Sequence, residues 1–180
     1  AMGLEYLFLK TGPLTMPPSQ LGAFAKSDPD QRSANIEWHV QPLSLDKFGD
    51  PLHEFNAITP SVCNPGPTSR GYVRIKTTDP HDYPAIQLNY LSTDEDREVT
   101  IAGMRYTRRI MHAAPLAGFN PQEWKPGPRL EYDDELLRAA GDLGMTTFHP
   151  VGSCKMGHDG MAVVDDRLAV HGVQNLRVID

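Results

Sequence analysis

The sequence predicts an α+β fold in which an antiparallel, in part mixed, sheet is covered by helices on one face. Two observations on the order of elements support this prediction. Four short stretches that alternate apolar and polar residues come first, and two stretches of helical periodicity follow them. Strands that succeed one another directly pair antiparallel, because parallel neighbours need a long crossover between them. Strands followed by a group of helices are typical of α+β proteins.

The first expected strand is residues 36–43, IEWHVQPL, where Ile36, Trp38 and Val40 alternate with polar side chains. A period of two is typical of a strand that buries one face. The same period is weaker in three further stretches, residues 53–62, 69–80 and 83–92. Residues 11–35 are expected to be irregular, because proline recurs there and interrupts regular elements.

Two helices are expected after the strands. Ser92 and Glu95 fit a capping box, in which each side chain bonds the backbone at a helix start. An apolar stripe of helical period follows and ends at about His112. A second, shorter helix is expected over residues 132–144, with Asp133 as its N-cap.

Composition limits the classes of function. The chain has 17 Lys and Arg against 23 Asp and Glu, a net charge of −6, which disfavours nucleic acid as a partner. It contains no apolar run of roughly 18 residues, so a membrane span in this piece is not expected. Its two cysteines do not form a disulfide framework. For location, a cytoplasmic and a membrane-associated protein both remain open.

The stretch TTFHPVGSCKMGHDG, residues 146–160, holds the candidate site. His149, Cys154 and His158, joined by Asp159, could ligate zinc, but the Pro- and Gly-rich spacing matches no common zinc motif. We therefore expect no metal there. Cys154 could instead be a nucleophile with His149 as its base, although no oxyanion-hole signature accompanies it. The residues alone also allow His149 to be an ordinary structural histidine.

Two quoted blocks, FHPVGSCKMG and VVDDRLAVHGVQNLRVID, closely resemble the C-terminal signature of the glucose–methanol–choline (GMC) oxidoreductases. SRGYVRIKTTDP and PAIQLNYLS resemble the substrate-binding domain of this family, in its choline-dehydrogenase-like members in particular. The likeness extends from about Gly12 to the end of the sequence and keeps the order of the blocks. The resemblance implies a GMC-type substrate-binding domain.

The resemblance also implies a chemistry. Members of the family oxidise an alcohol, choline being one example, to an aldehyde, and FAD accepts the hydride. His149 matches the first residue of the catalytic pair and would act as general base or alkoxide stabiliser. Asp180 matches an aspartate that lies near the flavin, and the second catalytic residue would follow it. The expected partners are thus a small-molecule alcohol and a missing N-terminal domain that binds the FAD cofactor.

A domain that binds FAD needs a βαβ unit with the motif G-x-G-x-x-G, and the sequence contains none. The FAD-binding Rossmann domain is therefore expected to be absent here and to be supplied by a missing N-terminal part of a parent enzyme. We expect an irregular lead-in over 1–35, the substrate-binding sheet and helices over 36–148, and the catalytic-histidine stretch over 149–180. Such a piece alone would be inactive. The alternative is a non-catalytic binding domain of similar architecture.

Overall fold

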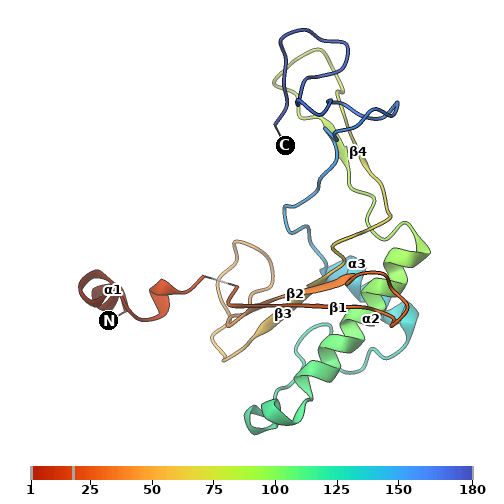
Figure 1. Ribbon diagram of the computed structural model, residues 1–180. Helices are drawn as coiled ribbons and strands as arrows, with labels where there is room; N and C mark the ends of the chain where they lie inside the picture. Colours follow the sequence, from red (N-terminus) through yellow and green to blue (C-terminus); the bar gives the residue numbers. More distant parts are fainter. Residues whose placement is uncertain (1, 18, 180) are drawn as a thin grey trace. The chain divides into compact units, whose positions relative to one another are not determined.

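The computed structural model describes residues 2–17 and 19–179 of the chain (Figure 1). The chain forms two compact units, each made of two segments. The first consists of Ala1–Thr68 and Thr93–Asp142, and the second of Ser69–Ser92 and Leu143–Asp180. The three-part division expected from the sequence stays a prediction.

The first unit contains a three-stranded antiparallel sheet, whereas the sequence predicted that four strands beginning at Ile36 would succeed one another in a sheet. Its strands are β1 (Leu21–Ala25), β2 (Ile36–Gln41) and β3 (Thr59–Cys63), in the order β1-β2-β3. Trp38 at the centre of β2 lies opposite Ala23 of β1 and Val62 of β3. The α+β class, with antiparallel strands and helices, is therefore confirmed.

The expectation of irregular structure over residues 11–35 was wrong for β1. This strand pairs with β2 although its own side chains are mostly exposed, including Leu21 and Phe24. Because no face of β1 is well buried, its sequence lacks the alternation that identifies a strand. An eight-residue helix, α1 (Met2–Leu9), precedes it and buries none of its residues.

Helix α2 (Asp94–Met111) packs against β2 and β3 and covers one face of the sheet (Figure 1). Its N-cap is Thr93, one residue later than expected, and the Thr93 hydroxyl accepts a hydrogen bond from the backbone of Asp96. The core between helix and sheet is formed by three buried side chains, Ile36, Trp38 and Val99. The indole of Trp38 also donates to the hydroxyl of Thr107, 2.8 Å away.

Gly103 is the point at which α2 approaches the sheet. It is buried, and a Cβ added to it would lie 2.8 Å from Cγ2 of Val62 on β3. Valine is stiff about χ1, so it cannot easily move away from such a contact. Glycine at position 103 therefore permits the observed distance between helix and strand.

Helix α3 (Asp133–Leu143) buries Leu136 and Ala139. The sequence prediction made Asp133 its N-cap, but Asp133 is the first helical residue and forms an ion pair with Arg105 of α2. The carboxylate of Glu135 accepts hydrogen bonds from the two backbone amides that precede the helix. Two short 3₁₀ helices, η1 (Pro13–Thr15) and η2 (Ala114–Phe119), complete this unit.

Asp96, in the first turn of α2, is a buried carboxylate with a structural role. It is 3% exposed and accepts hydrogen bonds from the backbone amide of Thr68 at 2.8 Å and from the side chain of Asn64 at 3.3 Å. Buried carboxylates are stable only when they are hydrogen-bonded or paired. Asp96 thus fixes the end of the segment that follows β3.

The second unit has little regular structure. Its only named strands within the described residues are β4 (Tyr72–Arg74) and β5 (Ala85–Gln87), an antiparallel pair. The tail forms isolated bridges around Val164, which is buried. Across the part of the chain that the structure describes, none of the helices has the length and apolar character to span a bilayer.

Replacement of Gly103 by alanine tests the approach of α2 to the sheet. The added methyl group overlaps Val62, and we expect a loss of about 1–3 kcal/mol in the free energy of unfolding. The matched control is Gly141→Ala in α3, where a new Cβ has no neighbour within 4 Å. That change should stabilise by up to about 1 kcal/mol through helix propensity. Thermal melting compares the two variants, and equal melting temperatures would contradict the close contact.

Replacement of Asp96 by alanine tests the buried carboxylate. The change leaves the Thr68 amide without its acceptor, and we expect a loss of about 1–3 kcal/mol in the free energy of unfolding. Asp94→Ala is the control, since that carboxylate is 88% exposed and pairs with Arg97 within the same helix turn. Denaturant unfolding should give Asp96→Ala a clearly lower free energy of unfolding than Asp94→Ala. The reverse order would show that Asp96 does not have this structural role.

Candidate functional site

His149 lies in the loop that follows α3, in the second unit of the chain, and its side chain is exposed. The preceding residue, Phe148, has a positive φ of 60° and is itself 68% exposed. A bulky residue adopts this left-handed conformation only where its surroundings hold it there. The ring of His149 thus follows a bend in the chain, and it is exposed to solvent.

The backbone before His149 is held by a short series of hydrogen bonds. The hydroxyl of Tyr90 donates to the hydroxyl of Thr146 at 3.1 Å, and Thr146 accepts from the backbone amide of Phe148 at 3.1 Å. Tyr90 comes just after β5, so this contact ties the loop to the other segment of the same unit. The approach to His149 is thus fixed by side chains that belong to the second unit.

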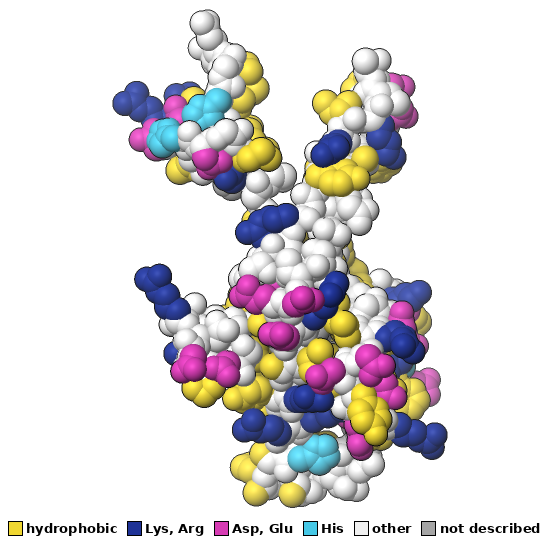
Figure 2. Space-filling view, turned by 90° about the vertical axis from the view of Figure 1, so that its right-hand side faces the viewer, with side chains coloured by type: hydrophobic (Ala, Val, Ile, Leu, Met, Phe, Trp, Pro, Cys, Tyr) yellow, Lys and Arg dark blue, Asp and Glu magenta, His cyan; other side chains and the backbone are white. Residues whose placement is uncertain are grey.

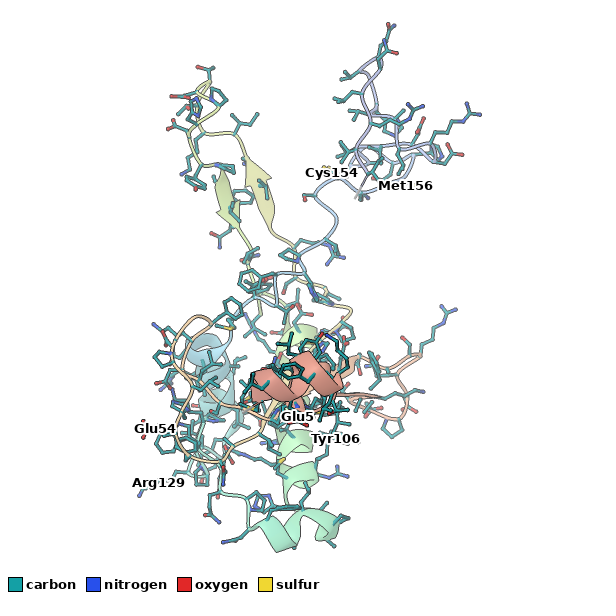
Figure 3. The ribbon with its side chains drawn as sticks, turned by 90° about the vertical axis from the view of Figure 1, so that its left-hand side faces the viewer. Glu5, Glu54, Tyr106, Arg129, Cys154 and Met156 are labelled. Atoms are coloured by element: carbon teal, nitrogen blue, oxygen red, sulfur yellow. The ribbon has the colours of Figure 1, made fainter. Side chains whose placement is uncertain are left out.

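The backbone after His149 is held by the tail. The buried Val164 forms bridges with Met156 and Val170, and its carbonyl accepts a hydrogen bond from the amide of Gly157. Figure 3 marks Cys154 and Met156 in this part of the chain. The loop around His149 is therefore anchored on both sides while the ring stays accessible.

Two carboxylates stabilise the turns of this tail. The pKa of Asp159 is lowered by a hydrogen bond from Lys155 and by one from the backbone of Met161. The pKa of Asp165 is lowered by the backbone amides of Ala169 and Arg167. Both are ionised at neutral pH, and the stability they confer is lost as the pH falls through their lowered pKa. Their partners make them structural groups.

The alternative roles weighed for residues 149–159 find little support in the geometry. Cys154 is a free, partly buried thiol, and no hydrogen bond among the described residues joins it to His149. His158 lies beside the ring of His171, with 6.4 Å between centroids, and His171 donates to the carbonyl of Gly157 at 2.9 Å. Within the described residues, the three potential metal ligands that converge belong to another region, the sheet of the first unit.

The structure places one of the two predicted site residues. His149 is described, and its catalytic role stays a prediction. Asp180, the predicted cofactor-binding residue, lies outside the described residues. Its proximity to a flavin therefore also stays a prediction.

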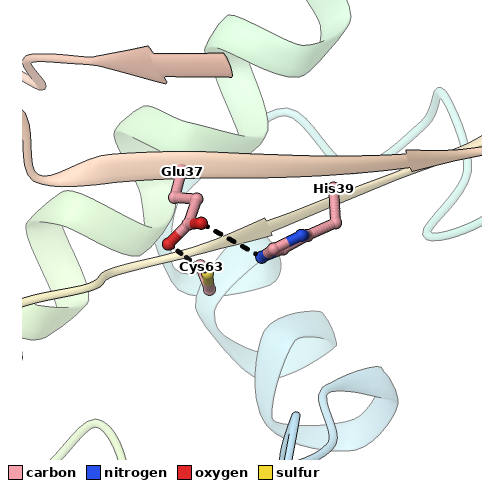
Figure 4. Close-up of side chains that lie close together, drawn as sticks. All are labelled: Glu37, His39 and Cys63. Carbon is pink, nitrogen blue, oxygen red and sulfur yellow. Dashed lines mark hydrogen bonds and ion pairs between the residues drawn. The ribbon is translucent and has the colours of Figure 1, made fainter. Parts of the chain in front are cut away.

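One cluster was missed by the sequence analysis. Glu37 and His39 of β2 meet Cys63 of β3, and their potential ligand atoms all lie within 4.8 Å of one another (Figure 4). The alternation of β2 places Glu37 and His39 on the same face, so two members could have been grouped from the sequence. The third member, Cys63, joins them only through the register between β2 and β3, and this register cannot be derived from the sequence pattern.

Comparison with known proteins places this chain in a family. The sequence profile of the family described as GMC oxidoreductase matches residues 67–180. An alcohol dehydrogenase [acceptor] from Pseudomonas putida is 37% identical over 98% of this chain. An oxygen-dependent choline dehydrogenase from Proteus mirabilis is 38% identical over 99% of it. The chain spans 32% of the length of each of these relatives.

A solved structure agrees with the sequence comparison. Pyridoxine 4-oxidase from Mesorbium loti superimposes with a TM-score of 0.78 and 28% identity, over 91% of this chain and 32% of that one. The profile match includes the loop with His149 and the anchoring tail. The chain belongs to the GMC oxidoreductase family, as its sequence motifs predicted.

Proposed function

We propose that this chain is the substrate-side, C-terminal part of an FAD-dependent enzyme that oxidises the CH–OH group of a small alcohol to an aldehyde. His149 is its general base or alkoxide stabiliser. The observation that supports this proposal best is the exposed His149 on a loop anchored at both ends, inside the region that matches the family. A choline-like primary alcohol is the substrate class that the relatives favour, one being a choline dehydrogenase and another an alcohol dehydrogenase.

The described residues do not fit the nucleotide half of FAD. Binding of its pyrophosphate needs a βαβ unit, in which a glycine-rich turn leads into a helix N-terminus. All the named strands of the described chain pair antiparallel, and the sequence lacks G-x-G-x-x-G. GMC relatives are FAD enzymes. We infer that the flavin is held by another part of the parent protein.

The proposed reaction requires His149 to take up a proton. Conversion of an alcohol to an aldehyde removes the hydroxyl proton and a hydride from the carbon, and flavin supplies the acceptor for the hydride. A neutral imidazole suits the removal of the proton, because its ordinary pKa of about 6.5 is close to working pH. An exposed ring on a fixed turn can reach a substrate that is bound against a neighbouring domain.

Apolar side chains on the tail support a larger parent protein. Val151, Val173, Leu176 and Ile179 are between 49% and 90% exposed. Figure 2 shows hydrophobic side chains on the visible surface interspersed with charged ones. Exposed apolar groups that gather along one segment are typical of surfaces that another part of a protein covers. A non-catalytic binding domain, the alternative, has no need of an exposed histidine at this position.

Replacement of His149 tests the proposed base. In the full-length flavoprotein, His149→Ala should lower kcat for alcohol oxidation by about 10²–10⁴-fold, as expected for loss of an acid–base group. The matched control is His158→Ala, an exposed histidine nine positions later in the same loop region. Stopped-flow measurement of flavin reduction by the alcohol under anaerobic conditions isolates the step. Unchanged reduction in His149→Ala with full flavin content would remove His149 from the mechanism.

The distribution of the cofactor can be tested separately. The 180-residue chain, purified by itself and mixed with FAD, should elute colourless from gel filtration, because it lacks the nucleotide-binding unit. The full-length protein should elute yellow under the same conditions. Co-elution of stoichiometric flavin with the short chain would show that these residues hold the cofactor and would overturn this part of the proposal.

A further inference from the structure

A turn of unusual backbone conformation carries Tyr90 in the second unit. Asn89 and Leu91, on either side of Tyr90, have positive φ values of 56° and 55°. Asparagine tolerates this left-handed conformation, whereas leucine adopts it only where neighbouring groups impose it. Residues held in such conformations are concentrated at functional sites. The backbone of this turn therefore sets the position of the Tyr90 side chain.

The segment before β4 imposes this conformation. Nδ2 of Asn89 donates to the carbonyl of Arg70 at 3.0 Å, and the backbone amide of Ser92 donates to the hydroxyl of Ser69 at 3.0 Å. A Cβ added to Gly71 would lie 2.0 Å from a carbonyl oxygen of β5, so only glycine permits this approach. The first three residues of the block SRGYVRIKTTDP thus hold both ends of the turn.

The hydroxyl of Tyr90 points at the loop of His149. It donates to Oγ1 of Thr146 at 3.1 Å, and Thr146 is half-buried. The same oxygen accepts from the backbone amide of Phe148 at 3.1 Å. A hydroxyl oxygen has two lone pairs, so both hydrogen bonds can form at once. Because Phe148 immediately precedes His149, this pair of hydrogen bonds orients the backbone from which the imidazole projects.

The contact matters more for geometry than for stability. The side chain of Tyr90 is 54% exposed, and an exposed hydrogen bond adds little to the free energy of unfolding because water competes for the same groups. A general base, however, must lie within hydrogen-bond reach of the proton that it takes. A displacement of about 1 Å can lower a rate by about 100-fold. Loss of the Tyr90 hydroxyl should therefore affect the reaction more than the fold.

We propose that Tyr90 and Thr146 are positioning residues, which fix the orientation of the His149 ring and so control the rate of alcohol oxidation. The inference rests on the proposed role of His149. Neither residue needs to touch the alcohol, because both act through the backbone that leads to His149. The affinity for the alcohol should therefore depend little on them.

The test uses anaerobic stopped-flow reduction of the flavin by the alcohol in the full-length flavoprotein. Tyr90→Phe, which removes only the hydroxyl, should lower the rate constant at saturating alcohol by about 10- to 100-fold and leave the apparent Kd nearly unchanged. The matched control is Tyr83→Phe, a tyrosine between β4 and β5 that is 85% exposed, and it should behave as the wild type. Only flavin-loaded molecules contribute to this rate constant, so a smaller folded fraction does not change it.

A second comparison determines whether Tyr90 acts through His149. In the His149→Ala background, Tyr90→Phe should slow flavin reduction no further, because no imidazole is left to orient. An equal loss in both backgrounds, or reduction at the wild-type rate in Tyr90→Phe, would overturn the positioning role alone. If His149→Ala itself is reduced at the wild-type rate, the proposed function fails and the positioning role fails with it.

Thr146 provides a test that leaves the tyrosine in place. Thr146→Val removes the hydroxyl and both hydrogen bonds, and should slow flavin reduction at least as much as Tyr90→Phe. Thr146→Ser restores a hydroxyl and should recover most of the wild-type rate. Equal rates of flavin reduction in Thr146→Val and Thr146→Ser would show that the hydroxyl does not position His149, and would overturn the proposal.

Discussion

The contact between helix α2 and the sheet at Gly103 determines which side chains of β2 lie in the core and which lie on the opposite face. It seals Ile36 and Trp38 into the core and leaves the alternate residues of β2 on the open face. Because successive side chains of a strand point to opposite faces, packing one face of β2 against α2 places a different set of residues on the other face. Apolar residues stabilise the unit, while Glu37, His39 and Cys63 meet on the opposite face. A shift of β2 by one residue would exchange these roles.

Much of the fold could be predicted from the sequence, since strong periodicity marks β2 and α2. The sequence failed at β1, whose exposed side chains carry no alternation, and it placed the start of α2 one residue early, at Ser92 instead of Thr93. In the tail, isolated backbone bridges form around Val164. Such features are set by tertiary contacts, which local propensity does not report.

The candidate site could likewise be predicted only in part. His149 could be named as a candidate because ordered motifs around it match a family, and the structure adds the hydrogen bonds that hold its loop. Chemistry of the residues alone could not decide between a ligand, a base and a structural histidine. The Glu37–His39–Cys63 cluster could not be found in the same way, because Cys63 is 26 residues from Glu37 and meets it only through strand pairing.

The central claim is that these residues present an imidazole to an alcohol whose flavin partner is held elsewhere in the parent protein. A crystal structure of the full-length flavoprotein with a bound, unreactive alcohol analogue tests it most directly. The account predicts that a ring nitrogen of His149 lies about 3 Å from the alcohol oxygen, which is hydrogen-bond reach for a general base. A structure in which His149 is remote from the ligand, while another side chain contacts that oxygen, would contradict it.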